Sequence, residues 1–297
     1  MTRTPVPDPV LGFYGPGSLM WRINREAVLL GAGPAALLLQ IAHPLIAEGV
    51  AQHSDFERDP FARLRGTLRT TMDMVFGDGP TASRALGRLN AVHATVRGEV
   101  ADPAAHAATG AHAYRALDPE LLLWVQATLI VTSVRAYGRW VRPLSDEDIE
   151  AFWQEARSLA PRMGIPLDRS PATWPALMAY WDLMLAPDGP IQVTPTALRL
   201  APTVLRPPFP WVPPSLVDLA GLPGMALLPA RIREAFGIEW TPREQRLARF
   251  LDAGIRLWVR SVPSDWRAMP PARAADRRAR QVAGYNRRTA SQEPTRA

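Results

Sequence analysis

The sequence predicts an all-α protein, and three observations support this fold class. Apolar residues recur at helical spacing through most of the chain. No stretch alternates polar and apolar residues between hairpin turns, as a half-buried strand would. Proline, glycine and capping residues stand mostly at the ends of the apolar stretches. With 297 residues, 47% of them apolar, the chain can bury a substantial core.

The first element expected is an extended arm at 1–18, which is rich in proline and glycine. A short helix follows at 21–30, and two glycines break the chain after it. A second helix is expected from Pro34 to about His53, with Pro44 inside it. Proline cannot donate to the carbonyl one turn earlier, so a kink is predicted beside His43.

The uncharged stretch at 28–47 is long enough to cross a membrane. Its internal glycines, prolines and histidine favour a buried core helix instead. Asp59 and Pro60 predict the start of a helix that reaches Phe76. The other segments expected are helices at 81–98, 121–140, 145–160, 174–185 and 243–259, a loop at 103–110, and short helices with wrapping loops at 187–229.

These elements predict one helical domain at 19–270, followed by a basic, partly disordered tail at 271–297. From Arg231 to Ala297 there are 15 arginines against 7 acidic residues, so the basic character belongs to this part. Such a surplus can attract nucleic acid or anionic membranes, but it is more often a solvated end. No nucleic-acid partner is expected, and peripheral membrane contact through the basic C-terminal part is left open.

Cysteine and lysine are both absent, which excludes disulfides, thiolate-bound metals and Schiff-base chemistry. Any metal must therefore be held by histidine or by oxygen ligands. The N-terminus lacks the basic start and short apolar core of a signal peptide, so a cytoplasmic protein is expected. All five histidines fall between positions 43 and 112, which predicts a single functional site.

His93 is the sharpest candidate for that site. It shares a helix face with Leu86, Leu89 and Val96, so its ring is expected to point into an apolar interior. Two interpretations stay open from the residues alone. His93 is either a core histidine with one hydrogen bond, or an axial ligand whose ring nitrogen faces a flat metal cofactor.

Arg63 and Thr67 lie one helical turn apart and therefore share a face. They could bind a propionate, an oxyanion or bound oxygen. Alternatively, they could be a surface arginine and a threonine that is hydrogen-bonded to its own backbone. His43, Glu48 and His53 could hold a non-haem metal, but their spacing is poor. The Glu-x-x-His pairs of di-iron bundles are missing from the chain.

Several of these residues fall in motifs of a known family. The chain contains the runs GAGPAALLLQIAHPLIAEGVAQHSDFERDPFARLRGT, FGDG, VHATVRGE and YRALDPELLLWVQATL, in that order. They resemble the MpaB-type oxygenase family, which includes the catalytic domain of rubber oxygenase (latex clearing protein). The resemblance covers roughly residues 12–202.

The resemblance implies a globin-like helical domain that holds haem b and cleaves isoprenoid or prenyl chains with O2. It matches His93, which follows Arg63 by 30 residues, to the proximal iron ligand, and it matches Arg63 and Thr67 to a pair near the haem. Glu48 is the nearest candidate for a carboxylate base, and His43 is expected beside it on the oxygen-binding side.

This chain departs from its relatives at two positions. Gly66 replaces a lysine that can cap the iron, and Gln126 replaces a histidine. The function expected is therefore a haem b-dependent oxygenase, an oxidoreductase that uses iron and O2 on a hydrophobic, unsaturated or isoprenoid-like substrate. The alternatives are a non-catalytic helical haem- or lipid-binding protein, and a basic module that works through the tail.

Overall fold

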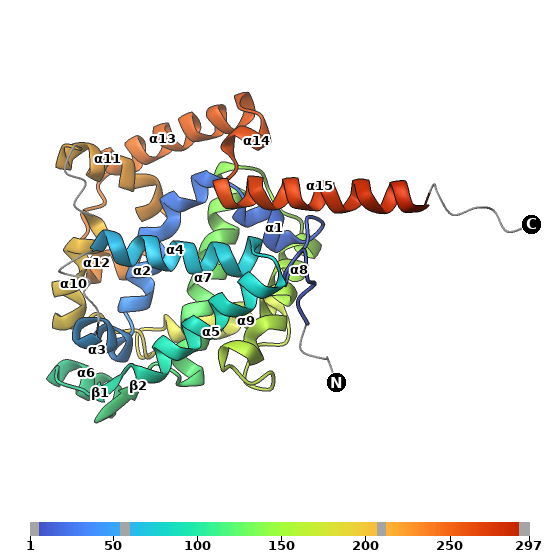
Figure 1. Ribbon diagram of the computed structural model, residues 1–297. Helices are drawn as coiled ribbons and strands as arrows, with labels where there is room; N and C mark the ends of the chain where they lie inside the picture. Colours follow the sequence, from blue (N-terminus) through green and yellow to red (C-terminus); the bar gives the residue numbers. More distant parts are fainter. Residues whose placement is uncertain (1–5, 54–59, 207–211, 291–297) are drawn as a thin grey trace, which may run out of the picture.

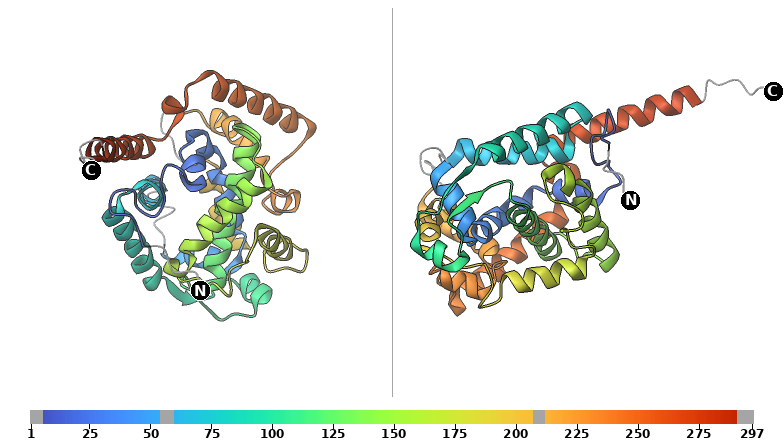
Figure 2. Two further views of the ribbon diagram at one scale, coloured as in Figure 1. Left: turned by 90° about the vertical axis from the view of Figure 1, so that its right-hand side faces the viewer. Right: turned by 90° about the horizontal axis from the view of Figure 1, so that it is seen from below.

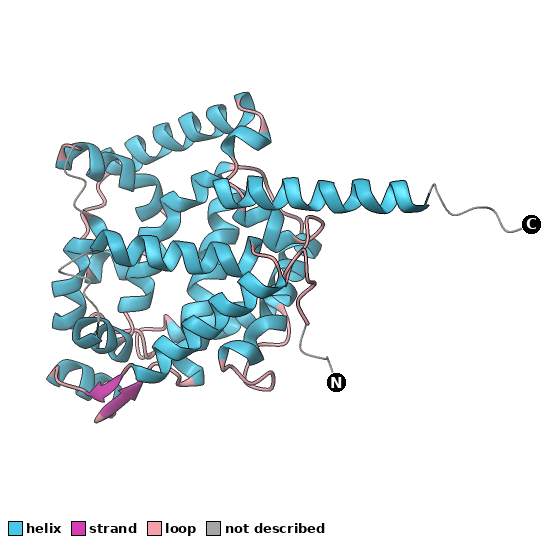
Figure 3. Ribbon diagram, in the orientation of Figure 1, coloured by secondary structure: helices cyan, strands magenta, loops and turns pink. Residues whose placement is uncertain are grey.

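The computed structural model describes residues 6–53, 60–206 and 212–290, and it leaves aside the side chains of 60–64 and 284–290. Over these residues the chain is mainly helical, which confirms the predicted all-α class (Figure 3). Most helices pack into one body, from which the last one projects (Figure 1). The α-helices are α1 (Leu19–Asn24), α2 (Gly33–Ile41), α3 (Pro44–His53), α4 (Pro60–Phe76), α5 (Gly79–Thr95), α6 (Pro103–Thr109), α7 (Pro119–Trp140), α8 (Asp146–Leu159), α9 (Trp174–Met184), α10 (Pro195–Leu205), α11 (Pro214–Met225), α12 (Ala230–Ala235), α13 (Pro242–Ser261), α14 (Ser264–Arg267) and α15 (Pro270–Ala290). The other elements are the 3₁₀ helices η1 (Ala27–Ala32) and η2 (Ala160–Met163) and the strands β1 (Arg97–Glu99) and β2 (Ala113–Arg115).

Helix α7 is the centre of the fold, and Figure 2 shows other helices on several sides of it. Asp118 caps it and Pro119 takes its first position. Helices α2, η1, α8 and α13 pack along it. Trp124 and Trp140 of α7 are fully buried, and the indole of Trp124 donates a 2.9 Å hydrogen bond to the carbonyl of Leu39.

The single kinked helix predicted for 34–53 is wrong, because the chain forms two helices there. The stretch 27–41 and α3 are bent by 105° at the break. Pro44 becomes the first residue of α3, where its missing N–H needs no intrahelical acceptor. The carbonyl of Gln40 instead accepts a 3.1 Å hydrogen bond from the N–H of His43.

The loop predicted at 103–110 is also wrong, because residues 103–109 form α6. The carboxylate of Asp102 accepts a hydrogen bond from the N–H of Ala104 at 2.9 Å, and Gly110 ends the helix with a φ of 66°. The sequence contains both the capping aspartate and the terminating glycine, but a helix of seven residues is too short to show a helical period. Strands β1 and β2 then pair antiparallel on either side of α6.

The sequence predicts that order fades beyond Pro270, whereas the structure continues there as α15. Ala272 and Ala275 are fully buried on its first turns. The carboxylate of Asp276 accepts a 2.9 Å hydrogen bond from the indole of Trp21. The first half of α15 is thus anchored on the body, while its far end projects (Figure 1). The division into a domain and a tail near this point stays a prediction.

One described helix, α7, is long and apolar enough to cross a membrane by length and composition alone. Its most apolar window is 72% buried inside the protein, as for the core helix of a helical body. The bent pair of 27–41 and α3 passes the same test only when its two parts are joined.

Candidate functional site

His93 lies two residues before the end of α5, close to β1. Asp78 caps the start of this helix by accepting the N–H of Thr81 at 2.8 Å. Leu86, on the same face as His93, is buried in the core. The His93 side chain itself is half-buried, with its Nδ1 atom shielded from solvent. The ring therefore sits at the rim of the interior, less deep than its apolar neighbours predict.

A cavity of about 480 Å³ opens beside His93. It lies where the end of α5, the two strands and the start of α7 meet. It is lined by His93, Ala94, Val96, Arg97, Arg115, Leu117, Asp118 and Pro119. One imidazole, two guanidiniums and one carboxylate thus share this cavity with four apolar side chains.

Arg97 and Arg115 are directly opposed residues of β1 and β2. Opposed residues of an antiparallel pair put their side chains on the same face, and like charges there destabilise the pair. Both arginines are exposed, and among the described residues no carboxylate forms an ion pair with either one. The ribbon therefore presents two adjacent, unneutralised cations at the cavity.

Asp118 connects this cavity to His43. Its carboxylate caps α7 by accepting the N–H of Glu120 at 2.9 Å. Burial lowers the pKa of His43 to about 4, and the charge of Asp118 opposes this by raising it. Nδ1 of His43 accepts the N–H of Leu45 at 3.3 Å, so the proton of the neutral ring is on Nε2. His43 is thus a buried, neutral hydrogen-bond donor close to Asp118.

Glu48 is buried and holds the strands against α3. Its Oε2 atom accepts hydrogen bonds from Nε2 of Gln52 at 2.9 Å and from the N–H of Ala101 at 2.8 Å. Gln52 in turn accepts a 2.8 Å hydrogen bond from the hydroxyl of Tyr114 on β2. Burial raises the pKa of Tyr114 to about 12, and the charge of Glu48 adds to the shift. The carboxylate expected as a base therefore positions the ribbon that carries Arg97.

The non-haem metal interpretation finds no support over the described residues. Nε2 of His53 lies 2.9 Å from the carbonyl oxygen of Arg97, and Glu48 is engaged as above. Within 6–53, 60–206 and 212–290, no group of three or more histidine or acidic side chains could hold a metal ion. His43, Glu48 and His53 thus do not form a ligand set.

Arg63 and Thr67 both belong to α4, which packs along α5, the helix that carries His93. The side chain of Arg63 lies outside the described residues. Thr67 is exposed, and its carbonyl accepts a 3.0 Å hydrogen bond from the hydroxyl of Thr71. The expected pair and His93 thus occupy the two helices of one hairpin.

Gln126, one of the two departures from the family motifs, is buried in α7. Its Nε2 donates a 3.0 Å hydrogen bond to the carbonyl of Ala156 on α8. This side chain ties two core helices together and does not line the cavity beside His93.

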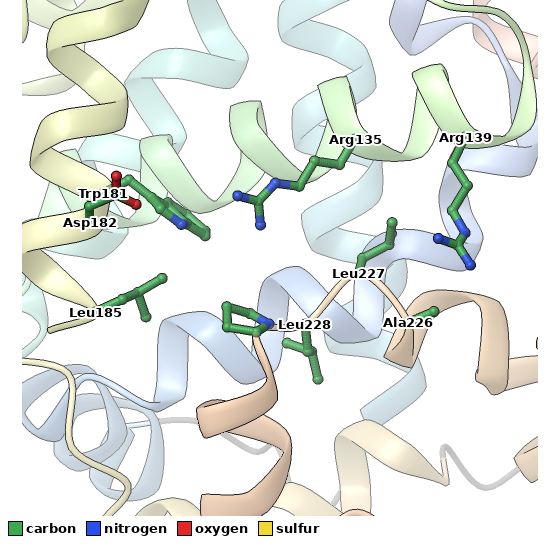
Figure 4. Close-up of a pocket in the computed structure, with 9 residues that line it drawn as sticks. Arg135, Arg139, Trp181, Asp182, Leu185, Ala226, Leu227 and Leu228 are labelled. Atoms are coloured by element: carbon green, nitrogen blue, oxygen red, sulfur yellow. The ribbon is translucent and has the colours of Figure 1, made fainter. Parts of the chain in front are cut away.

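A larger cavity, of about 690 Å³, lies near the opposite end of α7 (Figure 4). Arg135 reaches across it toward Trp181, with its guanidinium 5.2 Å from the ring centroid. Arg135 follows Pro119 by 16 residues, about 24 Å along the helix at ~1.5 Å per residue. No histidine lines this cavity, and one of its two arginines, Arg135, stacks on an aromatic ring. It is therefore separate from the site at His93.

Arg97, Arg115 and Asp118 are residues of the site that the sequence did not single out. Arg97 had a weak signal, since it follows His93 by four residues within a family motif. Arg115 also lies in a family motif, but only the pairing of β1 with β2 brings it beside Arg97.

Comparison with known proteins identifies the family of this chain. The family described as "ER-bound oxygenase mpaB/B'/Rubber oxygenase, catalytic domain" matches residues 20–260. One uncharacterized protein from Mycobacterium bovis and one from Mycobacterium tuberculosis are each 28% identical to this chain over 241 residues. The alignments cover 77% of this chain and 89% of each relative. No solved structure matches this chain significantly.

The helical body and the family match together define an oxygenase-type catalytic domain. The chain belongs to the mpaB and rubber oxygenase catalytic-domain family, as its sequence motifs indicate.

Proposed function

We propose that this protein is a haem b-dependent oxygenase that uses O2 on a hydrophobic, unsaturated or isoprenoid-like substrate. Membership of the oxygenase family supports the reaction class. The single observation that carries the haem proposal is the cavity in which His93 stands beside two unneutralised arginines and an apolar wall.

The residues around this cavity suit a haem. One imidazole would be sufficient as the protein ligand, because a porphyrin brings four nitrogen ligands of its own to the iron. Arg97 and Arg115 provide two cations, the number that two propionates would pair with. Val96, Leu117 and Pro119 provide apolar surface for the ring.

In this proposal His93 would hold the iron through a ring nitrogen, and bound haem would supply the capacity to bind and activate O2. His43 is neutral at physiological pH because its pKa is about 4, so it would donate a hydrogen bond from Nε2 without adding charge. Arg63 and Thr67 of α4 would line the side on which O2 binds. Glu48 would act as a base only after releasing Gln52 and Ala101, so its bonds favour a positioning role.

The test is the optical spectrum of the purified protein before and after addition of haem b. We expect a Soret band that is lost in His93→Ala and kept in the matched control His112→Ala, whose ring stacks on His106. Wild-type protein with no Soret band after haem addition would reject the proposal, whereas a band retained in His93→Ala would reject the ligand assignment.

Oxygen consumption with isoprenoid alkenes separates the oxygenase from its alternative. Haem-loaded protein should consume O2 only when an unsaturated substrate is present. Haem binding without substrate-dependent consumption would favour a non-catalytic haem- or lipid-binding protein.

A further inference from the structure

Helix α13 exposes large apolar side chains along its outer face. Phe250 is 76% exposed, Leu257 is 67% exposed and Trp258 is 43% exposed. Trp266, on the short helix α14 that follows, is 80% exposed. Exposed apolar residues scattered singly are normal, but a contiguous group marks a surface that contacts something apolar. Figures 1 and 2 place α13 at the periphery of the body.

Helical geometry puts the first two of these residues on one line. Phe250 and Leu257 are seven residues apart, two turns along the same face. On the opposite face, Ala248, Asp252 and Val259 are buried against the body. The inward residues fix the rotation of the helix, so the apolar line cannot turn inward without breaking these contacts.

Arginines flank this apolar line. Arg246, Arg249 and Arg260 of α13 are exposed, and no described carboxylate forms an ion pair with them. The two acidic residues of the helix are engaged elsewhere. Glu244 caps the helix start with Thr241, and Asp252 is bound by Arg139 and Trp140.

A basic groove of about 610 Å³ borders the same helix. Five arginines line it: Arg139, Arg142, Arg249, Arg256 and Arg260. Its one acidic residue is the engaged Asp252, so the groove carries a large positive surplus. Apolar side chains that project outward beside such a groove match a surface with an apolar interior and anionic head groups.

We propose that the outer face of α13, extended by Trp266, docks on an anionic lipid membrane and lies in its interfacial plane. Phe250, Leu257 and Trp258 would enter the boundary between head groups and acyl chains. The flanking arginines would pair with lipid phosphates from the rim, their stems covering apolar surface.

Two other occupants fit these observations less well. A second copy of the chain, related by a twofold axis, would bring the same arginines together and place like charges face to face. A nucleic acid would satisfy the arginines, but it would leave the aliphatic Leu257 without an apolar partner. The lipid surface serves both kinds of side chain at once.

Sedimentation of the full-length protein with vesicles tests this proposal. One vesicle population contains equal parts of phosphatidylglycerol and phosphatidylcholine, and the other contains phosphatidylcholine alone. We expect binding to the anionic vesicles that weakens as salt is raised. The double variant Phe250→Glu/Leu257→Glu should lower the partition coefficient by about tenfold or more. Arg246→Ala and Arg260→Ala should each lower it by about fivefold.

Matched controls keep the outcome decisive. Leu183→Glu alters an equally exposed apolar residue on α9 and should leave vesicle binding unchanged, as should Arg84→Ala on α5. Equal binding of wild type and Phe250→Glu/Leu257→Glu would overturn the proposal, as would equal binding to both vesicle types. A third result would also overturn the proposal: the wild type forms a dimer in sedimentation velocity, the double variant does not, and neither protein binds vesicles. The membrane proposal does not depend on the haem proposal. If every variant showed a Soret band but none bound vesicles, only the membrane proposal would be rejected.

Discussion

The indole Nε1 of Trp140 donates a 2.7 Å hydrogen bond to Oδ1 of Asp252, joining the C-terminal end of α7 to α13. The other carboxylate oxygen accepts two hydrogen bonds from the guanidinium of Arg139. Asp252 is buried, and among the described residues its one ion pair is with Arg139. One carboxylate therefore fixes both the position and the rotation of the helix that bears the proposed membrane face.

Replacement of Asp252 should destabilise the protein strongly. Asp252→Ala leaves a guanidinium and an indole N–H without their acceptor, which typically costs about 3–5 kcal/mol in a buried pair. Arg139→Ala should cost a comparable amount, because it leaves the buried carboxylate of Asp252 without its counter-charge. Urea denaturation of the two single variants and the double variant measures the coupling, and a coupling near zero would contradict this account.

The two roles considered for Glu48 predict different results. As an anchor of the ribbon, Glu48→Ala should lower the free energy of unfolding by about 1–3 kcal/mol, since Ala101 and Gln52 lose their acceptor. Glu48→Gln keeps one carbonyl oxygen and should cost less than about 1 kcal/mol. If Glu48 is a base instead, Glu48→Gln should lower the turnover by about a hundredfold at nearly unchanged stability.

The long helices could be predicted because period and caps agree over many residues. Helix α7 has a capping aspartate, a proline at its first position and a long apolar run. Helix α13 keeps its helical periodicity of apolar residues over a length of twenty residues. Helix α6 is too short to show a period, and the tight break before Pro44 depends on tertiary packing. Propensity alone reads Pro44 as a kink or as a start equally well.

The site could be predicted only in part, for a related reason. His93 stood out through its helix face and its family motif, both of which are local. Arg115 lies 22 residues further along the chain, and only strand pairing brings it opposite Arg97. No local pattern encodes that contact, since each strand has only three residues.

Arg97 and Arg115 should matter more to the haem-loaded protein than to the protein alone. Arg97→Gln removes one of two opposed cations, so the unloaded protein should keep or slightly gain stability. Haem affinity should fall by about threefold to tenfold, the usual range for a partly exposed ion pair of about 1 kcal/mol. Titration followed at the Soret band measures this, with Arg84→Gln as a control; equal affinity would remove Arg97 from the propionate role.

His43 should make the protein less stable as the solution becomes acidic. Its pKa falls from 6.5 in the unfolded chain to about 4 in the fold, so protonation favours unfolding below pH 6.5. Between these values the free energy of unfolding should rise with pH, by at most about 3 kcal/mol in all, and then level off. Urea denaturation at several pH values measures this slope. His43→Leu should reduce it, whereas the exposed His112→Ala should not.

Two glycines three residues apart on α11 test whether the close contact between α11 and η1 supports α13. A Cβ atom at Gly224 would lie 2.4 Å from the carbonyl oxygen of Gly31, whereas one at Gly221 would meet nothing within 4 Å. Gly224→Ala should therefore force α11 away from η1 and cost about 2 kcal/mol or more. Gly221→Ala should stabilise the helix by up to about 1 kcal/mol, because alanine loses less backbone entropy than glycine. Helix α13 packs on α11, so Gly224→Ala should also increase amide exchange in α13. If the two variants had the same thermal midpoint, the close contact of α11 with η1 would not exist in solution.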